Sequence, residues 1–181
     1  MSRQQCWSGS VARWLGLGIA LAQLGRPGVA RAEAQGWYAG IATGWYFPIE
    51  KPSSAYSLGG GGVLLLGYQL SSSLSLRLEV NMSLLAGDQH DTWNLRATPE
   101  IKWDLGSWRL RPYVWTGAGL AYEAIYPGPV SSATLVIPVG VGLQWELDSR
   151  TRLFVQASYD VLVKHLSAQS VPLLGGFEVH L

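Results

Sequence analysis

Strict alternation of apolar and polar residues is the main feature of the chain beyond about residue 35. In the segment 74–84, LSLRLEVNMSL, every even-numbered position is apolar and every odd-numbered position is polar. A period of two is typical of a β-strand, because successive side chains point to opposite faces. The run exceeds the ~5–6 residues of an ordinary globular strand. Its length fits a tilted transmembrane strand, which needs ~9–11 residues.

The same alternation recurs and predicts eight strands. In one of them Trp93 and Leu95 begin an apolar phase, while Arg96 lies in the opposite phase. The predicted strands are 36–48, 60–70, 74–85, 92–105, 108–122, 133–147, 151–162 and 170–181. A closed antiparallel barrel formed by one bacterial chain has an even number of strands. The sequence therefore predicts an all-β fold, an eight-stranded antiparallel transmembrane β-barrel arranged as an up-and-down meander.

The connections between these strands are of two kinds. Segments 71–73, 106–107 and 148–150 have the length of hairpin turns, whereas the links near 49–59, 86–91, 123–132 and 163–169 are longer. Short turns at one end and longer loops at the other are typical of outer-membrane barrels. The three turns also predict which residues lie opposite each other: Leu70 and Leu74, Tyr68 and Leu76, Leu105 and Trp108, Trp103 and Leu110, Asp104 and Arg109, Trp145 and Leu153, Glu146 and Arg152.

Aromatic residues indicate which face of the predicted barrel meets lipid. In the apolar phase they collect near both ends of the strands, as expected for rings at the two membrane interfaces. Those near the short turns are Trp37, Tyr68, Trp103, Trp108 and Trp145, and those near the longer loops are Trp45, Phe47, Trp93, Tyr122 and Tyr159. A soluble lipocalin-like barrel also has eight strands, but its apolar face points inward, and two aromatic belts disfavour it.

The opposite, polar phase carries charges of both signs and predicts a polar interior. Its charged members are Arg77, Glu79, Arg96, Glu100, Lys102, Asp104, Arg109, Arg111, Glu123, Glu146, Arg152, Asp160, Glu178 and His180. Glycines 40, 44, 117, 119, 140 and 142 share this phase. An eight-stranded barrel is just wide enough for side chains to fill. We therefore expect a packed core of salt bridges without a conducting pore, with Arg77 opposite Glu100 and Asn81 opposite Arg96.

The first 34 residues are predicted to be a cleaved signal peptide. Arg3 and Arg13 precede or begin an apolar run over 14–24, which is too short to span a bilayer as a helix. Small residues that a signal peptidase reads occur at Ala30 and Ala32 and at Ala32 and Ala34. The mature chain, 35–181, would lack Cys6 and therefore any disulfide. Its stability must then come from burial, from closure of a sheet or from a membrane.

Composition narrows the function classes further. The chain has 48% hydrophobic and 14% charged residues, which disfavours disorder. Removal of residues 1–34 takes away four of 13 basic and one of 12 acidic residues, leaving a net charge of −2. No basic field for nucleic acid results. His90, His165 and His180 have no metal-ligand spacing, and no motif indicates a cofactor.

At this point the chain resembles the small eight-stranded outer-membrane barrels of the OmpA/OmpX type over the whole of 35–181. The motifs concerned are Gly36-Trp37-Tyr38-Ala39-Gly40, Gly67-Tyr68-Gln69-Leu70, Pro112-Tyr113-Val114 with Gly117-Ala118-Gly119, and Phe177-Glu178-Val179-His180-Leu181. The last strand resembles the signal read by the barrel-assembly machinery, although it ends in Leu181 where Phe is usual. The resemblance implies a monomer in the outer membrane of a Gram-negative cell, in contact with membrane lipids and lipopolysaccharide, with both termini periplasmic.

The expected function is that of a non-enzymatic barrel that contributes to envelope structure or, through its loops, to surface interactions. An alternative is a lipid A acyl hydrolase, because some barrels of this kind are lipid A deacylases with a His-x-Ser pair and a later carboxylate. His165 and Ser167 have that spacing, and Glu178 follows. In such chemistry the imidazole removes the serine proton and the carboxylate orients the imidazole. Ala168 replaces the asparagine expected after the serine. A third candidate is passage of small hydrophobic molecules.

Overall fold

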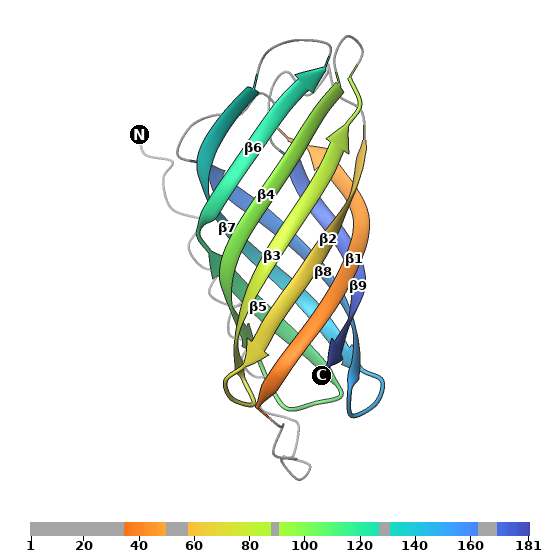
Figure 1. Ribbon diagram of the computed structural model, residues 1–181. Helices are drawn as coiled ribbons and strands as arrows, with labels where there is room; N and C mark the ends of the chain where they lie inside the picture. Colours follow the sequence, from red (N-terminus) through yellow and green to blue (C-terminus); the bar gives the residue numbers. More distant parts are fainter. Residues whose placement is uncertain (1–34, 50–57, 88–90, 127–130, 163–169) are drawn as a thin grey trace, which may run out of the picture.

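The protein is an all-β closed barrel (Figure 1). The computed structural model describes residues 35–49, 58–87, 91–126, 131–162 and 170–181. The strands within these ranges are β1 (Gly36–Pro48), β2 (Gly59–Gln69), β3 (Leu74–Leu85), β4 (Asp91–Asp104), β5 (Leu110–Gly117), β6 (Gly119–Tyr126), β7 (Ser131–Glu146), β8 (Thr151–Leu162) and β9 (Ser170–His180). No helix in the described ranges is long and apolar enough to cross a membrane.

Every neighbouring pair of strands is antiparallel, and the sheet closes on itself. β1 pairs with β2 along one edge and with β9 along the other, so the first and last strands meet. β5 and β6 occupy successive halves of one barrel strand, since both pair with β4 and β7. The predicted eight-stranded meander is therefore confirmed. Three predicted strands, 36–48, 74–85 and 151–162, have the observed bounds, and the fifth extends to Tyr126, beyond its predicted end at 122.

The break between β5 and β6 at Ala118 has a cause in the two neighbouring strands. Pro99 on β4 lies beside Ala118, whose N–H donates to the Pro99 carbonyl at 3.3 Å. On the other side, the register of β5 with β7 places Pro138 opposite Gly117. A proline has no N–H and cannot return a ladder hydrogen bond. The carbonyls of Gly117 and Ala118 therefore have no N–H donor on the neighbouring strands. The strand pairing is interrupted there, but its register is the same on both sides of the break.

The short turns lie together at one end of the barrel, which we call the short-turn end, and the opposite end is the long-loop end (Figure 1). The turn after Gln69 keeps the predicted pairing of Tyr68 with Leu76. In the turn after β7, Asp148 Oδ1 accepts hydrogen bonds from the Arg150 and Thr151 backbone N–H groups, at 2.7 and 2.8 Å. This arrangement preserves the predicted pairs of Trp145 with Leu153 and of Glu146 with Arg152.

The predicted two-residue hairpin at 106–107 is wrong. Asp104 lies opposite Tyr113, and Trp103 lies opposite Val114, so the register is shifted by four residues from the prediction. The connection closes on itself, because Arg111 Nε donates to the Trp108 carbonyl at 2.7 Å and Gly106 adopts a φ of 123°. An even shift keeps every side chain on its predicted face.

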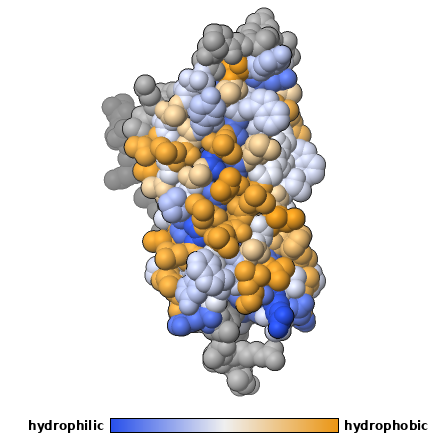
Figure 2. All heavy atoms as spheres, viewed as in Figure 1, coloured by the Kyte–Doolittle hydropathy of each residue, from blue (hydrophilic) through white to orange (hydrophobic). Residues whose placement is uncertain are grey.

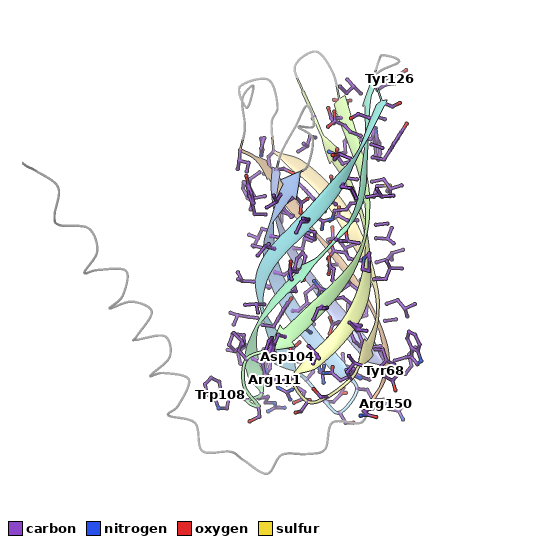
Figure 3. The ribbon with its side chains drawn as sticks, turned by 90° about the vertical axis from the view of Figure 1, so that its left-hand side faces the viewer. Tyr68, Asp104, Trp108, Arg111, Tyr126 and Arg150 are labelled. Atoms are coloured by element: carbon purple, nitrogen blue, oxygen red, sulfur yellow. The ribbon has the colours of Figure 1, made fainter. Side chains whose placement is uncertain are left out.

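The outer surface is apolar, as predicted, with aromatic rings near both ends. Figure 2 shows hydrophobic side chains over much of the barrel wall. At the short-turn end Trp37, Trp103 and Trp145 each expose half of their surface or more, and Trp37 packs edge to face on Tyr68 at 5.3 Å. Exposed aromatic residues near the long-loop end are Trp45, Phe47, Trp93, Tyr122, Tyr126 and Tyr159. Trp108 lies in the 105–109 connection and not on a strand, still at the short-turn end (Figure 3).

Candidate functional site

The interior of the barrel holds the charged side chains and is the candidate functional site (Figure 3). Alternation along each strand points every second residue inward, so polar residues that are far apart in sequence converge there. Buried charged residues among those described are Arg77, Glu79, Arg96, Glu100, Lys102, Asp104, Arg111, Glu123, Arg152 and Glu178. Asp160, Glu146 and His180 are partly exposed at the same face. The prediction of a packed polar interior is confirmed.

One ionic network centres on two arginines. Arg77 Nε donates to Glu100 Oε2 at 2.6 Å, and its Nη2 donates to Gln156 Oε1 at 3.2 Å. Arg96 forms an ion pair with Glu79, and its Nη1 lies 2.5 and 2.6 Å from the two carboxylate oxygens of Asp160. The predicted positions of Arg77 opposite Glu100 and of Asn81 opposite Arg96 are both observed. Since the arginines bridge carboxylates from three strands, the network links β3, β4 and β8 across the interior.

A second cluster surrounds Lys102 toward the short-turn end. Its Nζ donates to Gln144 Oε1 at 2.5 Å and lies 3.5 Å from Glu178 Oε2 and 3.7 Å from Asp104 Oδ1. The ammonium also lies 4.6 Å from the centre of the Tyr113 ring, which provides a cation–π contact. Four side chains from β4, β5, β7 and β9 thus converge on one lysine.

Aromatic rings also occupy the interior, and sequence reasoning missed them. Tyr38, Tyr46, Tyr113, Trp115 and Phe154 are buried, and the Arg77 guanidinium lies 4.7 Å from the centre of the Trp115 ring. Glycines make room for several of these rings: Tyr38 lies opposite Gly67, and Tyr113 lies opposite Gly142. A Cβ at Gly142 would come within 2.7 Å of Tyr113 Cε1. A glycine directly across from an aromatic residue on the neighbouring strand is the sequence feature that could have indicated an inward ring, once the register was known.

Arg109 was predicted to face inward, and this prediction is wrong. Because the β4–β5 register is shifted, Arg109 lies in the exposed 105–109 connection. Its Nε and Nη2 donate to the carbonyls of Glu146 and Leu147 at 3.2 and 3.3 Å. The carboxylate of Glu146 instead accepts from Arg111 Nη2 at 3.0 Å. Arg109 therefore joins two turns at the rim and takes no part in the interior network.

Several buried polar atoms have no hydrogen-bond partner among the described residues, and they concentrate along β4. Five inward residues of that strand provide Asn94 Oδ1, Arg96 Nε, Thr98 Oγ1, Glu100 Oε1 and both carboxylate oxygens of Asp104. The others are Arg77 Nη1, Trp115 Nε1, Gln144 Nε2, Glu178 Oε1 and His180 Nε2. Each such group costs about 1–3 kcal/mol if nothing satisfies it. One of them, Asp104 Oδ1, still lies 3.7 Å from the Lys102 ammonium.

The candidate hydrolase residues are only partly within the described ranges. His165 and Ser167, like His90, lie outside them. Glu178 is buried beside Lys102, in a strand whose first residue, Ser170, is eight residues away. At ~3.3 Å per residue this is about 26 Å along the strand. Over the described ranges, no group of three or more His, Cys, Asp or Glu residues is placed to hold a metal ion.

Comparisons with known proteins support the same architecture. No family model matches the sequence, and neither does any curated protein. Among solved structures, Neisserial surface protein A superposes with a TM-score of 0.64 at 15% identity, covering 80% of this chain and 97% of that one. The N-terminal β-barrel domain of Pseudomonas aeruginosa OprF gives 0.58 at 16% identity, with 81% and 98% covered. Ail, the attachment invasion locus protein of Yersinia pestis, gives 0.57 at 14% identity, with 81% and 99% covered. The chain has the fold of the small eight-stranded outer-membrane β-barrels.

Proposed function

We propose that the mature chain is an integral, non-enzymatic protein of the Gram-negative outer membrane that contributes to envelope structure or to surface interactions. The observation that carries this proposal is the combination of an apolar outer wall, bounded by aromatic rings, with an interior filled by paired charges. A closed barrel pairs every strand on both sides and leaves no sheet edge open to lipid, so it is stable in a membrane. An aqueous protein with this surface would aggregate.

The interior favours a structural role over catalysis. The carboxylates of Glu79 and Glu100 are ion-paired with Arg77. The carboxylate of Glu178 is ion-paired with Lys102. In the alternative function, a lipid A acyl hydrolase, Glu178 would have to orient His165 for proton transfer from Ser167. Its pairing with Lys102, and its separation along the strand from Ser170, disfavour that role. Passage of small hydrophobic molecules is also disfavoured, because an apolar solute would displace buried charges.

The positions of the chain ends and of the apolar wall support an orientation in the membrane and a set of partners. β1 begins and β9 ends at the short-turn end (Figure 1), which is the periplasmic end of outer-membrane barrels. We therefore propose periplasmic termini, a signal peptide over 1–34, and export followed by insertion through the barrel-assembly machinery. The exposed apolar wall would contact membrane lipids and lipopolysaccharide as a monomer, without nucleic acid, cofactor or metal.

Fractionation and lipid analysis test the proposal. The mature protein should begin near Gln35, copurify with outer membranes, and migrate faster on gels before boiling than after it. Mass spectrometry of lipid A from cells with and without the protein should give identical spectra. Loss of an acyl chain that depends on the protein, and that is abolished by Ser167→Ala, would overturn the non-enzymatic assignment. Recovery in the periplasmic soluble fraction would overturn the membrane assignment.

A further inference from the structure

Within the described ranges four strands, β2, β4, β7 and β9, run from the long-loop end to the short-turn end (Figure 1). The five residues where each of them ends repeat one pattern: the first, third and fifth are apolar, and the fifth is leucine. We call these segments the descending ends; they are 66–70 (LGYQL), 101–105 (IKWDL), 143–147 (LQWEL) and 177–181 (FEVHL). The last of them is the C-terminal segment that resembles the signal recognised by the barrel-assembly machinery.

The repeated feature is the outward face of each descending end. Side chains two apart on a strand lie on one face, and the final leucines are all exposed. The inward residues share neither size nor charge: Gly67 and Gln69, Lys102 and Asp104, Gln144 and Glu146, Glu178 and His180. A partner common to the four ends would therefore contact their three outward side chains.

The backbone of the four ends is equivalent as well. In each, the N–H of the final leucine donates to a carbonyl of the next strand along the barrel wall, which for Leu181 is β1. The acceptors are, in chain order, Leu74, Pro112, Thr151 and Trp37, at 2.9, 2.8, 3.0 and 2.9 Å. The C-terminal end thus occupies the same structural position as the three internal ends.

The chemistry of the membrane interface does not by itself explain the rings in these ends, Tyr68, Trp103 and Trp145. That interface favours aromatic residues whichever way a strand runs. The ascending neighbours nevertheless have leucine at the opposing outward positions, Leu76, Leu74, Leu110 and Leu153. Among the described ascending strands, β1 alone has a ring in this belt, Trp37. A preference for one chain direction points to a partner that pairs with the backbone, because strand pairing depends on direction.

We propose that 66–70, 101–105 and 143–147 are internal copies of the C-terminal recognition segment 177–181, and that the same receptor binds all four while the barrel assembles. The receptor chemistry that fits them is an open β-strand edge beside apolar pockets, which pairs with the backbone and takes up the outward side chains. Each end is free to pair in this way before its neighbouring strands are in place. The inference rests on the proposed insertion through the barrel-assembly machinery.

Leucine variants of the full mature chain test the inference. Leu105→Gln combined with Leu147→Gln alters two internal ends. Leu110→Gln combined with Leu153→Gln is the matched control, because it makes the same change at the same end of the barrel on ascending strands. The leucines are similarly exposed, 46% and 40% in the first pair against 53% and 40% in the second.

Assembly is followed by heat-modifiable gel migration in phospholipid vesicles with and without the reconstituted machinery. With the machinery, the Leu105 and Leu147 variant should assemble about tenfold more slowly than wild type, because it loses buried contacts with the receptor. The control variant should assemble close to the wild-type rate. Without the machinery, the two variants should insert at equal rates, which separates recognition from folding.

Equal rates of the two variants with the machinery would overturn the inference while leaving the assembly route intact. Failure of the machinery to accelerate the wild-type protein would instead overturn the proposed assembly route, on which the inference rests.

Competition by nonapeptides provides a second measurement that does not depend on the folding of a variant. Peptides 97–105 and 139–147 should slow machinery-dependent assembly of the wild-type protein. They should act at lower concentrations than peptide 173–181, because tryptophan buries more apolar surface than the valine of the C-terminal end. Peptide 97–105 carrying Trp103→Asp and Asp104→Trp keeps its composition but moves the ring to the other face, and it should not inhibit. Inhibition by peptide 173–181 alone would refute the internal copies.

Discussion

Removal of Arg77 is the most direct test of the ionic interior. Arg77 and Glu100 are each 3% exposed, and the guanidinium provides the only ion pair of Glu100 among the described contacts. Glu79, by contrast, keeps Arg96 and Gln156 when Arg77 is absent. Arg77→Ala therefore leaves chiefly one buried carboxylate unpaired, at a cost of about 3–5 kcal/mol. With a urea m-value of about 2 kcal/mol/M, the unfolding midpoint should fall by about 2 M.

The double variant separates pairing from packing. Arg77→Ala combined with Glu100→Ala removes the stranded charge, so it should be more stable than the sum of the single effects by about 1–3 kcal/mol. The assay is urea unfolding in phospholipid vesicles, followed by tryptophan fluorescence. Arg109→Ala is the matched control, because this exposed arginine contacts only backbone carbonyls and should cost about 1 kcal/mol or less. Additive single effects, or equal costs at Arg77 and Arg109, would refute the reasoning.

Three further predictions concern the wall, a turn and the interior packing. Leu78→Arg places a charge in lipid at mid-strand and should lower the free energy of unfolding in vesicles by about 2–4 kcal/mol. Ser75→Ala, on the inward face, should lower it far less, and equal losses would contradict the assignment of faces. The backbone N–H groups of Arg150 and Thr151 hold the pKa of Asp148 below its usual range, so its stabilisation is present above about pH 4 and is lost as the pH falls through the lowered pKa. A carbon-detected NMR titration should show this low pKa, and a normal value would contradict it. Gly142→Ala forces a Cβ against the Tyr113 ring and should cost about 1–3 kcal/mol, measured by the same unfolding assay; an unchanged midpoint would refute the close contact.

The strands and their faces could be predicted from the sequence because alternation is a direct consequence of backbone geometry. A residue such as Leu78 lies outward and its neighbour Arg77 inward wherever the strand is extended. The position of Arg77 opposite Glu100 could also be predicted, once the pairing of β3 with β4 was inferred from the connection between them. The interruption at Ala118 was not predicted, since it requires two prolines on neighbouring strands to coincide in space.

The hairpin after β4 shows the limit of pattern reasoning. Alternation does not change when one strand slides by two or four residues, and the pattern therefore allowed the short turn at 106–107. The actual connection depends on Gly106 and on the contact between Arg111 and the Trp108 carbonyl. The buried rings of Tyr38 and Tyr113 were missed for a related reason, since they share the polar phase and only the glycines across from them reveal their direction.

The Arg77–Glu100 pair distinguishes between registers of β3 and β4 that the hydrophobic pattern alone allows equally. If β4 slid by two residues along β3 in one direction, the lipid-facing side would look the same. Arg77 would then lie opposite Lys102, and Glu79 opposite Glu100, whereas in the observed register they lie opposite Glu100 and Thr98. Like charges directly across a strand pair are destabilising, and here they would be shut away from water. The buried charges thus destabilise misaligned pairings of β3 with β4 during barrel assembly, although the apolar outer face would tolerate those pairings.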